Sequence, residues 1–344
     1  MAKKIFLTGI SGFIGKEIAI EALSRGYSVH GTIRFRDDEQ RVRKTLSEAM
    51  GTSDIPVTIE RLELGLPSGW AKAMRGCNIV IHTAAHVPVV FPRNRAELFG
   101  AAIDGTKTVM QAAKRNEIER VILTSSSTAI TEGHRFRGKR IFDETDWSDL
   151  NGRRMTAYAT AKTLAEKGAW SAAQANDCPF KLTTIQPGVT MGPIRDLESV
   201  SSIAILTRML KGVDPAQPNF GFPYVHVFDV ARCHVDAITN DNTKGERIAA
   251  TNGFMWYPEV ASFVQEEFPE LGLKSRRFPS ALVRVLSPFK PRLRTFEPHL
   301  DRHADVSNAK ALSIFGRPFI PLDDMLRQTV RSLIEKSDTL LKKS

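Results

Sequence analysis

The chain has 344 residues, of which 42% are hydrophobic and 25% charged, so it can bury a large core and has no bias toward disorder. The formal net charge of +10 is compatible with a basic surface or an anionic ligand, and we expect no nucleic-acid partner. No apolar run approaches the roughly 18 residues that a membrane span requires.

The first half of the chain alternates short β-branched runs with longer amphipathic segments. The predicted strands are Lys4–Thr8, Ser28–Arg34, Val57–Glu63, Ile79–Thr83 and Arg120–Ser125. The predicted helices between them are Phe13–Arg25, Glu39–Met50, Trp70–Arg75 and Glu97–Asn116. The alternation predicts parallel strands joined by right-handed helical crossovers. The strands are apolar on both faces, as in an α/β fold whose doubly wound parallel Rossmann sheet is covered on both sides.

The second half continues this pattern and then becomes irregular. Its predicted strands are Lys181–Gln186 and Arg247–Thr251. Its predicted helices are Tyr158–Ala175, Ser201–Lys211, Asp229–Thr239, Pro258–Glu267, Ser307–Ile314 and Leu322–Lys336. We expect residues 1–191, with 224–251 returning to them, to form the dinucleotide-binding domain. Residues 192–223 and 252–344 would form a smaller C-terminal substrate-binding lobe over the strand ends.

Three glycines separate the first strand from the first helix. Gly9, Gly12 and Gly15 are spaced at i, i+3 and i+6, and the helix opens with Phe13 and Ile14. The first glycine permits a tight turn, the second lets the backbone approach a pyrophosphate, and the third lets helix and strand pack closely. A helix N-terminus then offers free N–H groups and a positive dipole end to the phosphates. The pattern therefore predicts a dinucleotide site.

The end of the second strand discriminates between the two nicotinamide dinucleotides. NAD binders usually place an acidic residue there for the ribose 2′-hydroxyl, but this chain has Ile33 followed by Arg34. A guanidinium suits a 2′-phosphate because it forms bidentate, charge-assisted hydrogen bonds. We therefore predict NADP(H) in preference to NAD(H). Lys44 is either a second cation for that phosphate or a residue of a solvated helix face.

A phenol and an ammonium are spaced for catalysis after the fifth predicted strand. Tyr158 and Lys162 lie at i and i+4, on one face of a predicted helix. A neighbouring ammonium favours the phenolate and so assists proton transfer near neutral pH. The fifth strand ends in three serines, Ser125, Ser126 and Ser127, at the sheet edge where ligands of parallel sheets bind. A hydroxyl there can hydrogen-bond a substrate carbonyl.

In this order and spacing, the TGxxGFIG, TSS and YxxxK motifs resemble the extended short-chain dehydrogenases/reductases, in the NAD-dependent epimerase/dehydratase superfamily. Finer features resemble the dihydroflavonol-reductase branch, with its aldehyde and ketone reductases. These features are Gly31-Thr32-Ile33-Arg34, Ile81-His82-Thr83-Ala84-Ala85, Asp104-Gly105-Thr106, Lys162-Thr163-Leu164-Ala165-Glu166-Lys167, Gln186-Pro187-Gly188, Gly192-Pro193 and Val225-His226-Val227-Phe228-Asp229-Val230. The resemblance covers the chain to about residue 250.

The resemblance implies a role for each matching position. Ser126 would polarise the substrate, Tyr158 would act as general acid and Lys162 would assist it. The implied cofactor contacts are Glu63 and Leu64 at the adenine, Thr83, Ala84 and Ala85 at the ribose, and Pro187, Gly188 and Val189 at the nicotinamide. Two positions depart from the wider family: Glu63 replaces an Asp, and Ala102 replaces a catalytic Asn that the reductase branch also commonly lacks.

The substrate positions fall in the least regular segments of the chain. We predict substrate contacts from His86, Val87, Thr190 and Tyr224. A purely structural role stays open for His86, as it does for His226. Three sparse cysteines, Cys77, Cys178 and Cys233, have no metal-ligand or CxxC spacing, so we predict no metal and reduced thiols in a cytoplasmic protein. The resemblance makes a monomer or homodimer the expected state.

Three functions remain open from the sequence. The favoured one is an NADP(H)-dependent oxidoreductase that reduces an aldehyde or ketone to an alcohol. The second is a nucleotide-sugar epimerase or dehydratase with bound NAD, which Arg34 disfavours. The third is a non-catalytic NADP(H)-binding regulatory protein, which the retained YxxxK motif disfavours. The basic segment Phe278–Phe296 could serve such a protein as a partner or membrane surface, although a lobe helix plus loop is the favoured interpretation.

Overall fold

The structure is a computed structural model that describes residues 3–85, 95–196, 203–213, 216–290, 293 and 296–336. Two of the predicted substrate positions, His86 and Val87, lie outside these residues.

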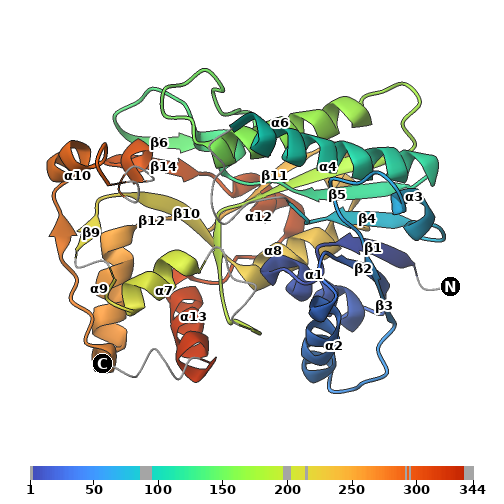
Figure 1. The fold of residues 1–344 in the computed structure, drawn as a ribbon, viewed down its shortest axis with the longest axis horizontal. Coiled ribbons are helices and arrows are strands. Elements are labelled where there is room, and N and C mark those ends of the chain that lie inside the picture. Colours follow the sequence, from blue (N-terminus) through green and yellow to red (C-terminus); the bar gives the residue numbers. More distant parts are fainter. Residues whose placement is uncertain are drawn as a thin grey trace.

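A parallel sheet of seven strands forms the centre of the described chain (Figure 1). Its strands are β1 (Lys4–Thr8), β2 (Ser28–Ile33), β3 (Val57–Arg61), β4 (Ile79–His82), β5 (Arg120–Thr124), β7 (Lys181–Pro187) and β11 (Arg247–Ala250). Their order across the sheet is β11-β7-β5-β4-β1-β2-β3, and every pairing is parallel. The predicted doubly wound Rossmann sheet is confirmed, and the order reverses between β1 and β4, where such folds bind ligands.

Alternate residues of the strands supply two separate cores. Ile5 and Leu7 of β1 pack into one core, and Phe6 between them packs into the other. Helices α1 (Phe13–Ser24), α2 (Asp37–Met50) and α8 (Val227–Asp236) cover the first face. Helices α3 (Trp70–Ala73), α4 (Arg95–Arg115) and α6 (Ala157–Ala173) cover the second, as Figure 1 shows. Because both faces are covered, the strands read as continuous apolar runs in the sequence.

Short strands that the sequence pattern did not predict build the region beyond the sheet edge. They form three small sheets: β8 (Val189–Met191) with β10 (Gly221–His226) and β12 (Phe254–Trp256), β6 (Gly138–Phe142) with β14 (Arg302–Val306), and β9 (Gln217–Pro218) with β13 (Arg277–Phe278). Strand β14 thus reaches back from the C-terminal part of the chain to a connection that precedes α6.

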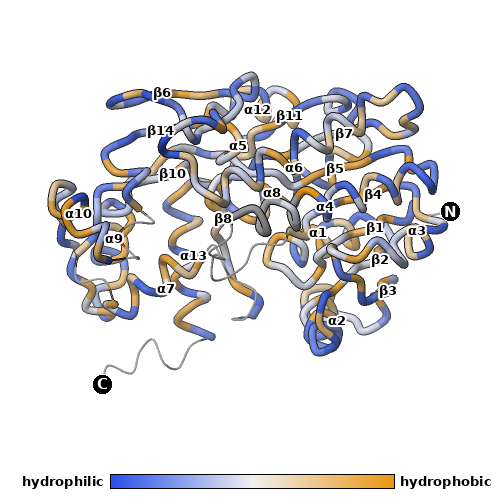
Figure 2. The backbone as a smooth tube through the Cα atoms, turned by 45° about the horizontal axis from the view of Figure 1, so that its top comes forward, coloured by the Kyte–Doolittle hydropathy of each residue, from blue (hydrophilic) through white to orange (hydrophobic). Residues whose placement is uncertain are grey.

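Helices α7 (Ala204–Leu210), α9 (Tyr257–Glu267) and α13 (Leu322–Lys336) pack around a core of their own. Two further helices in the C-terminal part of the chain are α10 (Ser280–Leu286) and α12 (Ala309–Phe315), and α12 packs on β11 with Ala311 in the core of the main sheet. Figure 2 shows hydrophilic and hydrophobic residues alternating along α13, whose apolar side buries Met325, Leu326 and Val330. Helix α10 lies within the basic segment Phe278–Phe296, for which a helix plus loop was the favoured interpretation. No helix among the described residues is long and apolar enough to cross a membrane.

Candidate active site

The glycine turn between β1 and α1 is shaped by close backbone contacts. Gly9 has φ +71°, and a Cβ there would lie 3.0 Å from the backbone of Ala84. A Cβ on Gly15 would lie 2.1 Å from the Gly9 carbonyl oxygen, so no larger residue fits. Gly12 precedes the first helical residue, and no side chain caps the helix. The uncapped N–H groups and the close turn fit a dinucleotide pyrophosphate.

A threonine hydroxyl joins the ends of β1 and β4. Thr8 Oγ1 accepts hydrogen bonds from the backbone N–H groups of Thr83 (3.1 Å) and Ala84 (3.0 Å). It also lies 2.7 Å from His82 Nδ1. Since the two N–H groups occupy its acceptor sites, the hydroxyl donates to Nδ1, which places the imidazole proton on Nε2. The predicted cofactor residues Thr83 and Ala84 are thereby held beside the glycine turn.

His82 is a structural residue at this strand end. Complete burial, aided by the nearby Lys162 ammonium, lowers the pKa of His82 to about 3. The ring is therefore neutral at physiological pH, as its acceptor role toward Thr8 requires. His226 is also structural, because its Nδ1 accepts from the backbone N–H of Phe228 (3.0 Å) and caps α8.

The predicted catalytic residues come from β5 and α6. Lys162 Nζ donates to the carbonyl oxygen of Thr124, the last residue of β5, at 3.2 Å. Ser126, two residues further on, accepts hydrogen bonds at Oγ from the N–H (3.2 Å) and the Oγ1 (3.0 Å) of Thr128. Tyr158 lies one turn before Lys162 on α6 and is half-buried. The helix face that carries the YxxxK motif therefore meets the end of β5 that carries the serines.

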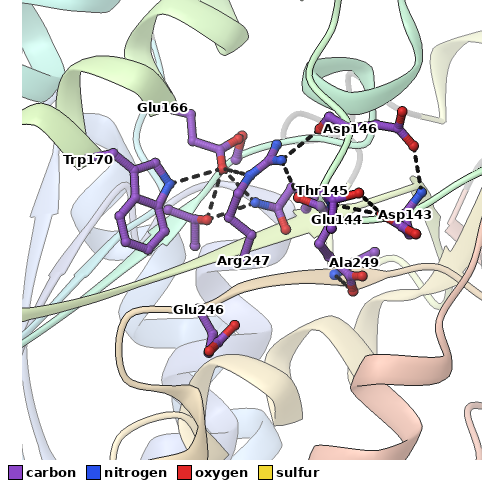
Figure 3. A network of polar contacts seen from close by, with 12 residues as sticks. Asp143, Glu144, Thr145, Asp146, Glu166, Trp170, Glu246, Arg247 and Ala249 are labelled. Atoms are coloured by element: carbon purple, nitrogen blue, oxygen red, sulfur yellow. Dashed lines mark hydrogen bonds and ion pairs between the residues drawn. The ribbon is translucent and has the colours of Figure 1, made fainter.

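A buried glutamate on the same face anchors α6 to the sheet, as Figure 3 shows. Glu166 is 1% exposed and follows Lys162 by one turn. Its carboxylate forms an ion pair with Arg247 of β11, with Nε to Oε1 at 2.8 Å. It also accepts hydrogen bonds from Ser125 (2.5 Å), Thr184 (2.9 Å) and Gln186 (2.7 Å) on β7 and the end of β5.

Arg247 extends the same network to the connection that precedes α6. Its Nη1 donates to the carbonyl oxygens of Glu144 (2.5 Å) and Asp146 (2.7 Å), and its guanidinium lies 3.6 Å from the centre of the Trp147 ring. The sequence offered Glu166 only as part of a family motif and did not indicate Arg247 at all. Together they hold α6, the helix that carries Tyr158 and Lys162, against the sheet.

The segment after β7 turns away from the main sheet beside the candidate site. A Cβ on Gly188 would lie 2.5 Å from the carbonyl oxygen of Pro223, and Val189 pairs with Tyr224 between β8 and β10. Thr190 Oγ1 donates to the Gly188 carbonyl oxygen at 3.1 Å. Tyr224 is 3% exposed and helps to line an apolar pocket with Val189 and Met191. The predicted nicotinamide and substrate positions are thus adjacent.

The residues predicted to contact the adenosine end are more exposed. Arg34 and Glu63 are each about half-exposed, and their side chains are 3.6 Å apart. Lys44 is 76% exposed and lies 3.9 Å from Glu48, which agrees with a solvated helix face. Arg41, one turn earlier on α2, forms an ion pair with Asp38. Burial is the main reason why the pKa of the Lys16 amine on α1 is lowered, and the charge of the nearby Arg41 lowers it further.

Comparisons with known proteins agree with the fold and the motifs. The model of the NAD dependent epimerase/dehydratase family matches residues 5–250. Cinnamoyl-CoA reductase 2 of Medicago truncatula is 30% identical over 96% of this chain and 91% of its own length. Dihydroflavonol 4-reductase of Gerbera hybrida is 27% identical over 77% of this chain and 73% of its own length.

The solved structures show the same architecture. The yeast methylglyoxal/isovaleraldehyde reductase Gre2, crystallised with NADPH, superposes with a TM-score of 0.77, covering 96% of this chain and 98% of its own, at 23% identity. Fold, motifs and family model together define the class. The chain belongs to the NAD dependent epimerase/dehydratase family, within the extended short-chain dehydrogenases/reductases, and the predicted resemblance is confirmed.

Proposed function

We propose that this protein is an NADP(H)-dependent oxidoreductase that reduces an aldehyde or ketone to an alcohol. The observation that carries the proposal is the contact of Lys162 with the end of β5, which brings the Tyr158–Lys162 face of α6 to Ser126. The reductases among the relatives support the same reaction class. We further propose that residues 1–191 and 224–251 hold the cofactor and that the other segments form the substrate-binding lobe.

The three side chains divide the work on the carbonyl oxygen. Because Thr128 occupies the acceptor sites of Ser126 Oγ, the serine proton is free to donate to that oxygen. A nicotinamide cofactor, when bound, would supply the hydride for the carbonyl carbon. Tyr158 transfers its hydroxyl proton to the oxygen, and the hydride and proton together give the alcohol. Lys162 uses one donor on Thr124 and keeps its others for the cofactor ribose and the phenol.

NADP(H) suits the adenosine end because that end carries cations. Arg34 follows the second strand, and its half-exposed guanidinium can turn from Glu63 to a 2′-phosphate. We propose Arg41 as the second cation in place of Lys44, since Arg41 lies on the α2 side that approaches α1. The glycine turn admits no side chain at Gly15, and no side chain caps α1, so its backbone N–H groups are left for the pyrophosphate.

The test is NADPH oxidation with a panel of aldehydes and ketones. Tyr158→Phe should lower kcat by about 10²–10⁴-fold because the general acid is lost. Tyr27→Phe removes a phenol far along the chain from the site and serves as the control. An unchanged rate in Tyr158→Phe would reject the mechanism. Purification of the protein with NAD bound and no carbonyl reduction would instead favour an epimerase or dehydratase.

A further inference from the structure

A second pocket, named the polar pocket here for the charged and hydroxyl-bearing residues in its lining, begins just after Ser126. It is formed where α5 (Thr128–Thr131) and the residue after it meet β10 and β14. Glu132, His299 and Arg302 line it together with the hydroxyls of Thr128 and Thr131. Phe222 lines both this pocket and the apolar pocket described above, so the two cavities are neighbours.

Two charged residues are buried at the polar pocket with unused hydrogen-bonding capacity. Glu132 is 4% exposed, and Arg302 is 5% exposed. Glu132 Oε1 lies 3.4 Å from His299 Nδ1, whereas its Oε2 has no partner among the described residues. Arg302 Nη2 donates to the His134 carbonyl oxygen at 2.7 Å, and its Nε is likewise without a partner there. Buried polar atoms are rarely left unsatisfied, so both atoms point to a ligand.

The pocket is coupled to the reacting centre through one residue. Thr128 lines the pocket and also donates both of its hydrogen bonds to Ser126 Oγ. A substrate whose carbonyl oxygen receives the Ser126 proton would reach the pocket by extending past Thr128 toward Glu132. This geometry makes the pocket a place for a second functional group of the same molecule.

The charges of the pocket identify the chemistry of that group. An acid and a guanidinium face the same cavity, so its formal charge is balanced, and neither an anion nor a cation is favoured. A hydroxyl can donate to the Glu132 carboxylate while accepting from Arg302 Nε. We propose that the substrate is a carbonyl compound that carries a hydroxyl, and that Glu132 and Arg302 recognise this hydroxyl. The inference rests on the proposed reductase function.

Matched substrates test the inference. A series of ω-hydroxy-2-alkanones of increasing length is compared with alkanones in which a methyl group replaces the hydroxyl. At the length that reaches the pocket, the wild type should prefer the hydroxylated member by about 10-fold or more in kcat/KM, because the methyl leaves two buried polar atoms unpaired. Glu132→Leu should abolish that preference, and Glu132→Gln, which keeps an acceptor, should reduce it less.

Two controls separate recognition from folding. Glu119→Leu makes the same change before β5, at the opposite edge of the sheet, and should leave the preference unchanged. Thermal unfolding of each variant shows whether the fold is kept, and the ratio within one variant cancels any loss of active protein. If Glu132→Leu does not fold, the preference in kcat/KM is measured in Glu132→Gln instead.

The outcomes are distinct for the two proposals. Absence of a preference at every chain length, or its survival in both Glu132 variants, would overturn the hydroxyl inference while leaving carbonyl reduction intact. A crystal of the complex with only ordered water between Glu132 and Arg302 would overturn it too. If NADPH reduces neither member of any pair nor any other carbonyl compound, the proposed function itself fails.

Discussion

The cofactor side and the substrate side of the site are built differently. At the ends of β1 and β4, beside the glycine turn, backbone groups and neutral side chains satisfy one another, as Thr8 does with His82 and Ala84. At the polar pocket, charged side chains are buried with polar atoms that no described residue satisfies. The comparison teaches that the cofactor side meets its own hydrogen-bonding needs, whereas the polar pocket leaves hydrogen-bonding capacity that the proposed substrate hydroxyl would fill.

Acid should destabilise the fold through its buried histidines. Burial lowers the pKa of His82 to about 3 and the pKa values of His226 and His234 to about 4. Because the unfolded chain takes up these protons near pH 6.5, stability is complete above that pH and falls as the pH drops below it. With three such histidines the slope approaches about 4 kcal/mol per pH unit.

Denaturant unfolding between pH 7.5 and pH 5 measures this slope. His234→Gln should reduce it by about a third, since one buried imidazole is lost. Equal free energies of unfolding across the window would show that these rings are not neutral in the fold.

Loss of the α6 anchor should be the largest effect of a single substitution. Glu166→Ala leaves Arg247 buried without its carboxylate, which typically costs about 3–5 kcal/mol. Glu166→Gln retains an acceptor for Thr184 and Gln186 and should cost less. The melting temperature and kcat should fall together, because Tyr158 and Lys162 depend on the position of the helix. A Glu166→Ala protein as stable as the wild type would contradict the assigned anchor.

The glycine turn should resist even one methyl group. Gly15→Ala places a Cβ 2.1 Å from the Gly9 carbonyl oxygen, so the turn must shift, at a cost of about 1–3 kcal/mol in stability and a loss of NADPH affinity. Gly168→Ala is the matched control, because a Cβ at that helical position meets nothing within 4 Å. There we expect a gain of about 0.5–1 kcal/mol. Titration of NADPH by fluorescence compares the two variants.

Substitutions at the predicted site for the adenosine end of the cofactor should have the smallest effect. They should change the preference for NADPH over NADH and little else. Arg34→Ala removes about 1.5–3 kcal/mol of charge-assisted bonding, so KM for NADPH should rise roughly 10–100-fold while KM for NADH changes little. Lys44→Ala should leave both values near the wild type, since its side chain is 76% exposed. Equal changes for the two cofactors would remove Arg34 from the 2′-phosphate site.

Local pattern was sufficient for the central sheet and for part of the site. The ends of the strands in the main sheet were predicted to within two residues, because the apolar, β-branched content of runs such as Lys4–Thr8 and Arg120–Thr124 indicates a buried strand. The glycine triplet and the YxxxK pair depend on spacing within a single turn or helix. Both features depend only on residues that are close in the sequence, so they can be recognised without knowing which distant segments pack against them.

Pairings between distant residues could not be predicted in this way. Strand β14 pairs with β6, and Arg247 forms an ion pair with Glu166, although both pairs are far apart in the sequence. The strands involved are short, and each charged residue alone resembles an ordinary surface charge. The neutral state of His82 likewise depends on burial that only the assembled sheet supplies.

The amino-acid sequence by itself determined the doubly wound sheet, the dinucleotide turn and the family, because steric and periodic constraints act between near neighbours. Tertiary structure alone decided which charges became buried, which helix face met the end of β5, and where the polar pocket opened beside Thr128. Those outcomes depend on the dielectric surroundings and the partners that remote segments bring together, and neither exists until the chain has folded.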